Sequence, residues 1–263
     1  MKNRCLAAVF CMSVAAAAQA APMRTELTRE NMILEKTQFE AGLVGEGRDA
    51  SGDEFAQTYG LSATTIMPYA RYGLTKELTL NAGIPVKTVS PEGLSDSTGL
   101  GDLQLGFDVV VYQDTLGYPY LMPYANIGLP TGDEDKGLGA GQLTATMGAV
   151  IGTTVCDDYH WAVDIGYTVA QDKNGVNIGG SFIWDLSKKC SVLAEVLRND
   201  ANLSADIGDR TFITNAKTLG LGGVIYRPTD AWMVGVYAGG SLEGDGESIV
   251  AAKICRTFDR LFE

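Results

Sequence analysis

Charged and aromatic side chains at alternate positions of apolar strands are the residues of this sequence that could act on a solute. In 99-GLGDLQLGFDVVVYQ-113, Asp102 and Asp108 share one parity, while Leu105 and Phe107 share the other. This is the period-2 pattern of a strand with one polar and one apolar face. In a soluble sandwich the apolar face fills the core, whereas in an outer-membrane barrel it faces lipid and the acids line a lumen. The two interpretations predict different functions.

Other strands also carry charged or aromatic residues at inward-facing positions if the polar parity lines a lumen. Side chains that are neighbours in strand order could then form a constriction that selects small amphipathic solutes. The alternative is that they only fill a narrow twelve-stranded interior. The lumen and constriction candidates are Tyr69, Arg71, Asp102, Asp108, Tyr120, Tyr124 and Asp164.

Residues that could support catalysis or bind a metal are sparse. The single histidine, His160, is expected in a turn beside Trp161 and has no evident serine partner for a Ser-His hydrolase. The acidic run 133–135 offers oxygen ligands that suit calcium, but it lacks the spacing of an EF-hand loop and is typical of a solvated loop tip. We therefore predict no enzyme activity, no catalytic residue, no cofactor and no metal site.

The cysteines allow one redox hypothesis. Cys156 and Cys190 fall in two short turns at the same end of the predicted strands, separated by one hairpin, and Cys255 lies near that end too. A Cys156–Cys190 disulfide is one hypothesis, since an exported protein meets an oxidising compartment. Three free thiols are the alternative.

The N-terminus has the pattern of a bacterial export signal. Lys2 and Arg4 precede an apolar run at 6–18 that is followed by Gln19-Ala20, which predicts a signal peptide over 1–20. The run is shorter than the roughly 17 residues that a membrane-spanning helix needs. Loss of these two cations changes the formal net charge from −12 to −14. So acidic a chain is a poor partner for nucleic acid, because little is available to neutralise phosphates.

The elements that must position the lumen candidates are twelve strands. Every second connection between them is short, and the others are mostly long, acidic and rich in glycine, as at 46–54, 131–141 and 199–210. Short turns at one end, long loops at the other and an even strand count favour a transmembrane barrel over a sandwich. The strands are expected at about 35–45, 59–74, 78–88, 100–113, 117–130, 140–154, 160–170, 175–185, 190–198, 214–226, 230–240 and 247–258.

The aromatic residues provide an independent indication. All three tryptophans fall beside short turns, on the apolar parity of their strands, and a tyrosine and a phenylalanine fall near the same end. Amphipathic rings are stabilised at the level of the lipid headgroups, so such a set is expected at one membrane interface of a barrel. The predicted interface girdle is Tyr72, Trp161, Trp184, Trp232 and Phe258.

Three glycine-containing motifs, in order, resemble a known family. They are 71-RYGLT-75, 99-GLGDL-103 and 129-LPTGD-133, with Gly139 and Gly141 following. In this order and spacing they resemble the outer-membrane barrel family associated with the meta-pathway of phenol degradation. The resemblance covers most of the mature chain and implies a barrel that admits hydrophobic or aromatic compounds. It transfers no ligand-binding residue.

The sequence thus predicts an all-β protein, a single antiparallel up-and-down transmembrane β-barrel of about 12 strands. The expected layout is a signal peptide at 1–20, an N-terminal periplasmic segment at 21–33 that either plugs the lumen or hangs below it, and an outer-membrane barrel at 34–263. The favoured function is a porin-like channel for passive uptake of small hydrophobic or aromatic molecules across the bacterial outer membrane. The alternatives are a non-conducting structural or surface-interaction barrel that acts through its acidic loops, and a secreted soluble all-β domain. The expected partners are outer-membrane lipids, the barrel insertion machinery and a small-molecule solute, without nucleic acid.

Overall fold

The computed structural model describes residues 29, 33–54, 57–93, 95–113, 119–170, 173–199, 203–207, 210–214, 217–243 and 247–259. The predicted signal peptide at 1–20 and most of the segment at 21–33 lie outside these residues. Among the described residues, no helix is long and apolar enough to cross a membrane.

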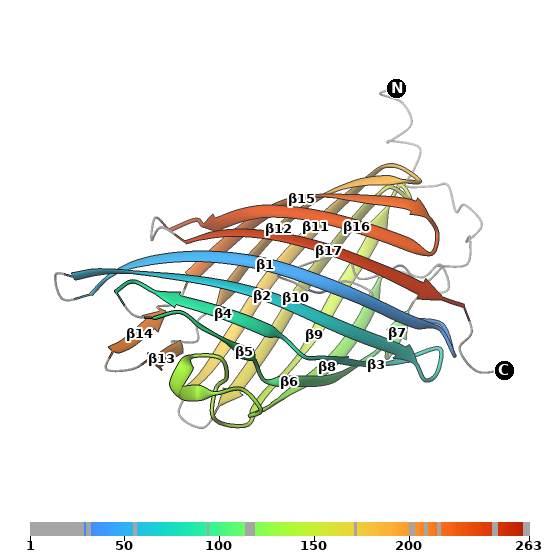
Figure 1. Cartoon of the computed structure of the whole chain (residues 1–263). Coiled ribbons are helices and arrows are strands. Elements are labelled where there is room, and N and C mark those ends of the chain that lie inside the picture. Colours follow the sequence, from blue (N-terminus) through green and yellow to red (C-terminus); the bar gives the residue numbers. More distant parts are fainter. Residues whose placement is uncertain are drawn as a thin grey trace.

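The described part of the chain forms a closed antiparallel barrel (Figure 1). The barrel closes because β1 pairs with β2 on one side and with the last strand, β17, on the other. Its strands are β1 Phe39–Glu54, β2 Gln57–Gly73, β3 Leu78–Gly83, β4 Val86–Pro91, β5 Ser97–Leu100, β6 Leu103–Val109, β7 Tyr112–Gln113, β8 Tyr120–Leu129, β9 Thr144–Val155, β10 Tyr159–Ala170, β11 Lys173–Ser187, β12 Cys190–Asn199, β15 Lys217–Thr229, β16 Trp232–Ser241 and β17 Ser248–Phe258.

Within the described residues these segments amount to twelve barrel strands, as predicted. The stretch containing β3 and β4 is one barrel strand interrupted at Ile84-Pro85, and β5 and β6 form another interrupted at Gly101-Asp102. Proline has no backbone N–H, so a break in the ladder at Pro85 is expected. β7 adds a short pairing to the end of β8.

Two predicted loops contain strands instead. Residues 46–54, expected as a loop, continue β1 and pair with β2 as far as Glu54–Gln57. Residues 199–210, also expected as a loop, contain β13 (Leu203–Ile207) and the first residue of β14 (Arg210–Thr214), which pair with each other in a separate two-stranded sheet. Polar and glycine-rich composition indicated loops there. The hairpins form because backbone hydrogen bonds join two strands that are adjacent in sequence, whatever their side chains.

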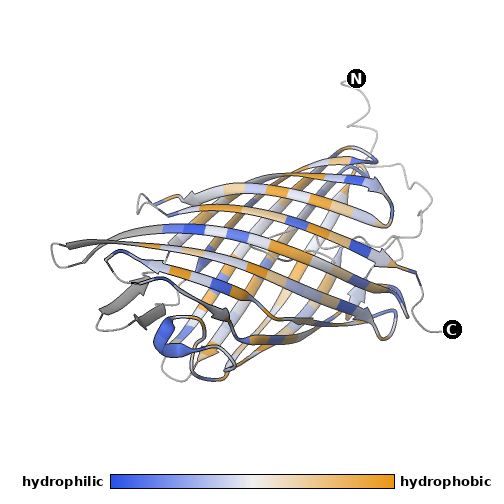
Figure 2. Cartoon of the chain, viewed as in Figure 1, coloured by the Kyte–Doolittle hydropathy of each residue, from blue (hydrophilic) through white to orange (hydrophobic). Residues whose placement is uncertain are grey.

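Hydrophobic and hydrophilic residues alternate along most strands (Figure 2), and most of the large exposed side chains of the strands are apolar. In β17 every second residue from Ile249 to Thr257 is buried, whereas Val250 and Ile254 are exposed. On β6, Leu105 and Phe107 are exposed, while Asp108 is fully buried. The exterior is therefore the apolar face, and the acids point inward, which is the arrangement of a membrane barrel and the opposite of a soluble sandwich.

One side of the interior is filled by apolar side chains. We call this cluster the packed wall; most of it lies on β15, β16 and β17, with one residue each from β11 and β12. Its inward residues are Ile183, Leu193, Leu219, Leu221, Ile225, Met233, Tyr237, Ile249, Ala251 and Cys255. The charged side chains of Glu195 and Lys253 are buried on the same side.

The described part of the N-terminal segment lies inside the barrel. The backbone N–H of fully buried Leu34 donates to Thr79 Oγ1 on β3 at 2.8 Å. Gly73, at the end of β2, exchanges backbone hydrogen bonds with Thr37 and Gln38. Ile33 packs against an inward cluster that contains Tyr120 and Tyr124. The sequence leaves open whether residues 21–33 enter the lumen or lie below it. The two described residues of this segment, Arg29 and Ile33, lie inside the lumen.

Candidate functional site

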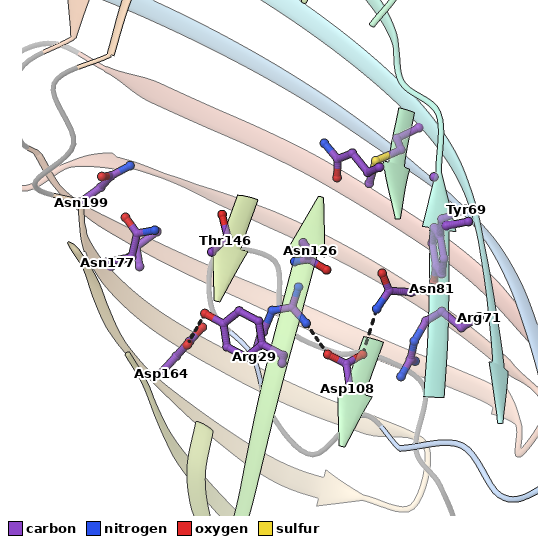
Figure 3. Close-up of a pocket in the computed structure, with 16 residues that line it drawn as sticks. Arg29, Tyr69, Arg71, Asn81, Asp108, Asn126, Thr146, Asp164, Asn177 and Asn199 are labelled. Carbon is purple, nitrogen blue, oxygen red and sulfur yellow. Dashed lines mark hydrogen bonds and ion pairs between the residues drawn. The ribbon is translucent and has the colours of Figure 1, made fainter. Parts of the chain in front are cut away.

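A cavity of about 360 Å³ occupies the side of the lumen opposite the packed wall (Figure 3). We call the inward face that lines it on β2, β3, β6, β8, β9 and β10 the cavity wall; β11 and β12 contribute its far margin. Its volume is within the range of small-molecule pockets. The lining residues are Arg29, Met67, Tyr69, Arg71, Asn81, Ala82, Gly83, Gln104, Asp108, Tyr124, Asn126, Thr146, Asp164, Asn177, Leu197 and Asn199.

Arg29 projects into this cavity and is held there by two contacts. Its Nη1 pairs with Asp108 Oδ1 at 2.5 Å, and its guanidinium lies over the Tyr124 ring, 4.0 Å from the centroid. Asn81 Nδ2 donates to the other oxygen of Asp108 at 3.1 Å. Both oxygens of this fully buried carboxylate therefore have partners, which offsets the cost of removing it from bulk water.

Tyr124 connects this cluster to the next strands. Its hydroxyl donates to Asp164 Oδ1 at 2.8 Å. The end of its ring lies over Gly148 on β9 and Gly166 on β10, where any Cβ would overlap it. Glycine at these inward positions lets the tyrosine lie flat across the barrel wall, so the hydroxyl reaches a carboxylate two strands away.

A second ion pair lies where the cavity meets β1. Glu40 and Arg71 are opposite each other in the β1–β2 register, and Arg71 Nη1 donates to Glu40 Oε1 at 3.2 Å. Both side chains are buried, with exposures of 0% for Glu40 and 3% for Arg71. Among the described residues, Arg71 Nε and Nη2 and Glu40 Oε2 have no hydrogen-bond partner.

The structure brings most of the predicted lumen residues together. Tyr69, Arg71, Asp108, Tyr124 and Asp164 line the cavity, whereas Asp102 and Tyr120 do not. Tyr120 instead packs in the inward cluster with Met122 and Val150. Parity assigned these two residues to the inside, but it carries no information on their height along the barrel axis.

Asp102 holds a loop rather than lining the cavity. Its Oδ1 accepts from the backbone N–H of Gly132 at 2.9 Å and its Oδ2 from that of Ala140 at 2.7 Å. Thr131 Oγ1 donates to the Gly101 carbonyl and accepts from Leu103 N. The carboxylate thus joins both ends of the 131–140 loop, and the second and third glycine motifs of the sequence meet in space at this clamp.

The predicted lumen set omits the carboxamides of the cavity, Arg29, and other lining residues such as Met67 and Thr146. The amides stand on the same inward parity as the acids, so alternation could have identified them, but amides carry no charge to draw attention. Arg29 lies outside every strand, and no periodicity predicts its position. The omitted amides are Asn81, Gln104, Asn126, Asn177 and Asn199.

The predicted girdle residues lie at the end of the barrel with the short turns. Trp161, Trp184 and Trp232 are 53%, 41% and 37% exposed, so their rings face outward. Their neighbours are also aromatic or cationic: Trp161 is 4.4 Å from the Phe182 ring, Trp184 stacks with Tyr159, and Arg256 lies over Trp232. Tyr72 and Phe258 both pair in register with Phe39.

The other groups that could do chemistry form structural contacts. His160 lies in β10 rather than in a turn, with Nδ1 at 2.9 Å from Thr154 Oγ1 and Nε2 at 3.0 Å from Asp185 Oδ2. Asp185 also accepts from Arg227 and Ser191, so its charge is shared among several donors instead of orienting one imidazole.

The acidic run 133–135 and the three cysteines were the candidates for a calcium site and a disulfide. Asp133 pairs with Lys136 at 2.7 Å, and among the described residues no group of His, Cys, Asp and Glu is placed to hold a metal ion. Cys156, Cys190 and Cys255 are free in the structure, so the Cys156–Cys190 disulfide is not formed there.

Several solved structures share this fold. An outer-membrane channel from Pseudomonas putida F1 superposes with a TM-score of 0.66 at 15% identity, covering 94% of this chain and 100% of that one. The KdgM porin gives a TM-score of 0.54 at 10% identity over 83% of this chain and 99% of that one. The translocator domain of the autotransporter NalP from Neisseria meningitidis gives 0.52 at 11% identity, over 84% and 87%. At these identities the likeness shows the fold of outer-membrane barrels.

The sequence itself matches one family model. No curated protein matches the chain. The model with the description "Putative MetA-pathway of phenol degradation" matches residues 35–252, which is nearly the whole barrel. The resemblance carried by the three glycine motifs is thereby confirmed, and the chain belongs to this phenol-degradation-pathway family of outer-membrane barrels.

Proposed function

We propose that this protein is a channel of the bacterial outer membrane through which small molecules, among them hydrophobic or aromatic ones, diffuse into the periplasm. The solute would pass the inward charges, amides and tyrosines of the cavity wall without covalent chemistry or energy coupling, so the protein would not be an enzyme. The end with the short turns would face the periplasm, and the long acidic loops would face outward.

One observation carries the proposal: a closed barrel with an apolar exterior encloses a lumenal cavity lined by polar and aromatic side chains. A barrel that served only as a membrane anchor would not need ion pairs, amides and tyrosine rings around such a cavity. Two proteins of similar fold, an outer-membrane channel and a porin, support conduction. Met67 and the rings of Tyr69 and Tyr124 beside the charges support solutes with an apolar part.

The partners proposed for this function follow from the surface. Outer-membrane lipids would contact the apolar exterior and the outward-facing tryptophans, and the barrel insertion machinery would place the chain after removal of residues 1–20. Nucleic acid is not proposed as a partner because the formal net charge of the chain is −12.

Planar-bilayer recording of the purified, refolded barrel tests the proposal. We expect discrete single-channel current steps in symmetric salt from protein whose folded state is verified by its heat-modifiable migration in electrophoresis. A correctly folded barrel that carries no current would reject the channel function.

A specific observation keeps a second function in consideration, that of a non-conducting barrel acting through its acidic loops. The packed wall fills one side of the interior, and Arg29 occupies part of the remaining space. The absence of current in both the full chain and a chain that lacks residues 21–33 would favour this second function. Current that appears only after the deletion would instead show a channel that its own N-terminus closes.

A further inference from the structure

Arg71 is a buried cation beside the lumenal cavity, and two of its donors have no partner among the described residues. Its side chain is 3% exposed and lines the cavity from β2 (Figure 3). The bond to Glu40 uses Nη1 alone, and no described residue accepts a hydrogen bond from Nε or Nη2. These two nitrogens form one edge of the planar guanidinium, and their N–H groups point in nearly parallel directions.

An unpaired edge of this kind has an energetic consequence. A buried donor that lacks an acceptor loses most of the hydrogen-bonding energy it has in water, and the loss is larger for a charged group. An oxygen atom placed against the edge can accept from both nitrogens in a charge-assisted contact. The edge is therefore a strong point of attraction for a solute that carries an acceptor oxygen.

The residues around Arg71 define the rest of such a solute. Met67 and Tyr69 share its inward parity on β2 and line the cavity. A thioether and an aromatic ring make an apolar surface next to the donors. A compact apolar body that bears one oxygen matches this combination.

The local charges discriminate between a neutral and an anionic oxygen. Glu40 already neutralises Arg71, and Arg29 neutralises Asp108, which leaves the Asp164 carboxylate as a further negative charge on the cavity wall. The acidic chain as a whole also repels anions from the lumen. A second carboxylate would meet this negative field, whereas a hydroxyl or carbonyl oxygen would not.

We propose that the Nε–Nη2 edge of Arg71, together with Met67 and Tyr69, is a lumenal binding site for small neutral molecules that carry a hydroxyl or carbonyl oxygen on an apolar body. The site rests on the proposed channel function and makes it more specific, since it names the chemical class that the lumen retains. Arg71 sets the specificity through its two donors, and the apolar group positions the body of the solute.

Three probes of similar size test the site: benzyl alcohol, benzoate and toluene. Their binding to the refolded full chain in detergent micelles is measured by ligand-observed NMR titration, which requires no conduction. Arg71→Lys keeps a cation opposite Glu40 but removes the two-donor edge. Arg227→Lys is the matched control, because Arg227 pairs with Asp185 and does not line the cavity.

We expect benzyl alcohol to bind the wild-type chain and the Arg227→Lys variant equally, and the Arg71→Lys variant about tenfold more weakly, the change expected when one hydrogen bond to a charged group is lost. Benzoate and toluene should bind the wild type more weakly than benzyl alcohol. Equal binding of benzyl alcohol to wild type and Arg71→Lys, or tighter binding of benzoate, would overturn the proposal. If the barrel binds benzyl alcohol but carries no current, the site is supported and the channel function is rejected. If it carries current but does not bind benzyl alcohol, the channel function is supported and the site is rejected.

Discussion

The packed wall and the cavity wall are built from the same kind of strand, but they use their inward positions differently. On β15 to β17 most inward residues are apolar and pack against one another, although Lys253 and Thr257 on β17 are buried with them. On β2 to β10 the inward positions hold ion pairs, amides and tyrosines around a cavity. The first arrangement resembles the core of a soluble protein placed inside a barrel, and the second leaves room for a solute.

The Glu40–Arg71 and Arg29–Asp108 ion pairs likewise differ in how easily water reaches them. Glu40 and Arg71 lie where the cavity meets β1, with the Glu40 side chain fully buried. Arg29 and Asp108 lie within the cavity, and the Arg29 side chain is 19% exposed. A charge that loses its partner can be solvated only where water can reach it, so the cost of breaking each pair reports how dry its surroundings are.

Glu40→Ala should produce the largest effect on stability. The variant leaves the Arg71 guanidinium buried without its counter-charge, and we expect a loss of about 3–5 kcal/mol in the free energy of unfolding. Denaturant titration of the barrel in lipid vesicles measures it. The double variant Glu40→Gln with Arg71→Gln should recover most of the loss, and a cost below about 1 kcal/mol for the single variant would show that water reaches this pair.

Met233→Ala tests the packed wall. Met233 is fully buried in the cluster, so its truncation should cost about 2–5 kcal/mol through the lost contacts and the void left behind. Val236→Ala, on the same strand but facing outward with 56% exposure, is the control and should cost less. Equal losses in the same unfolding assay would mean that this side of the interior is not a packed core.

Arg29→Ala should have the smallest effect on stability, about 1 kcal/mol, because Asp108 keeps its bond to Asn81 and water can enter from the cavity. Its main consequence should be a larger single-channel current, since a side chain leaves the lumen. Arg198→Ala, which removes an ion-paired arginine on the outward parity of β12, should leave the current unchanged. A current that does not rise in Arg29→Ala would place the conducting path elsewhere.

Particular residues show how far the sequence predicts this molecule. Alternation on β6 and β10 placed Asp108 and Asp164 inside correctly, since a period of 2 determines the face of a strand. It did not give their height, so Asp102 was grouped with them although it holds the 131–140 loop. The packed wall was not foreseen because two apolar parities do not reveal which one faces inward. The position of Arg29 was left open between the lumen and the space below it, because it depends on a tertiary ion pair rather than on local periodicity.

Single-channel recording of two neighbouring variants on β9 tests the central claim, that solutes pass along the cavity wall. Thr146 lines the cavity, whereas Met147 faces outward and is 58% exposed. Thr146→Trp should reduce the current severalfold, while Met147→Trp, equally bulky but on the lipid side, should conduct as the wild type does. Equal currents in the two folded variants would contradict the account, because a path along this cavity cannot be insensitive to a tryptophan placed within it.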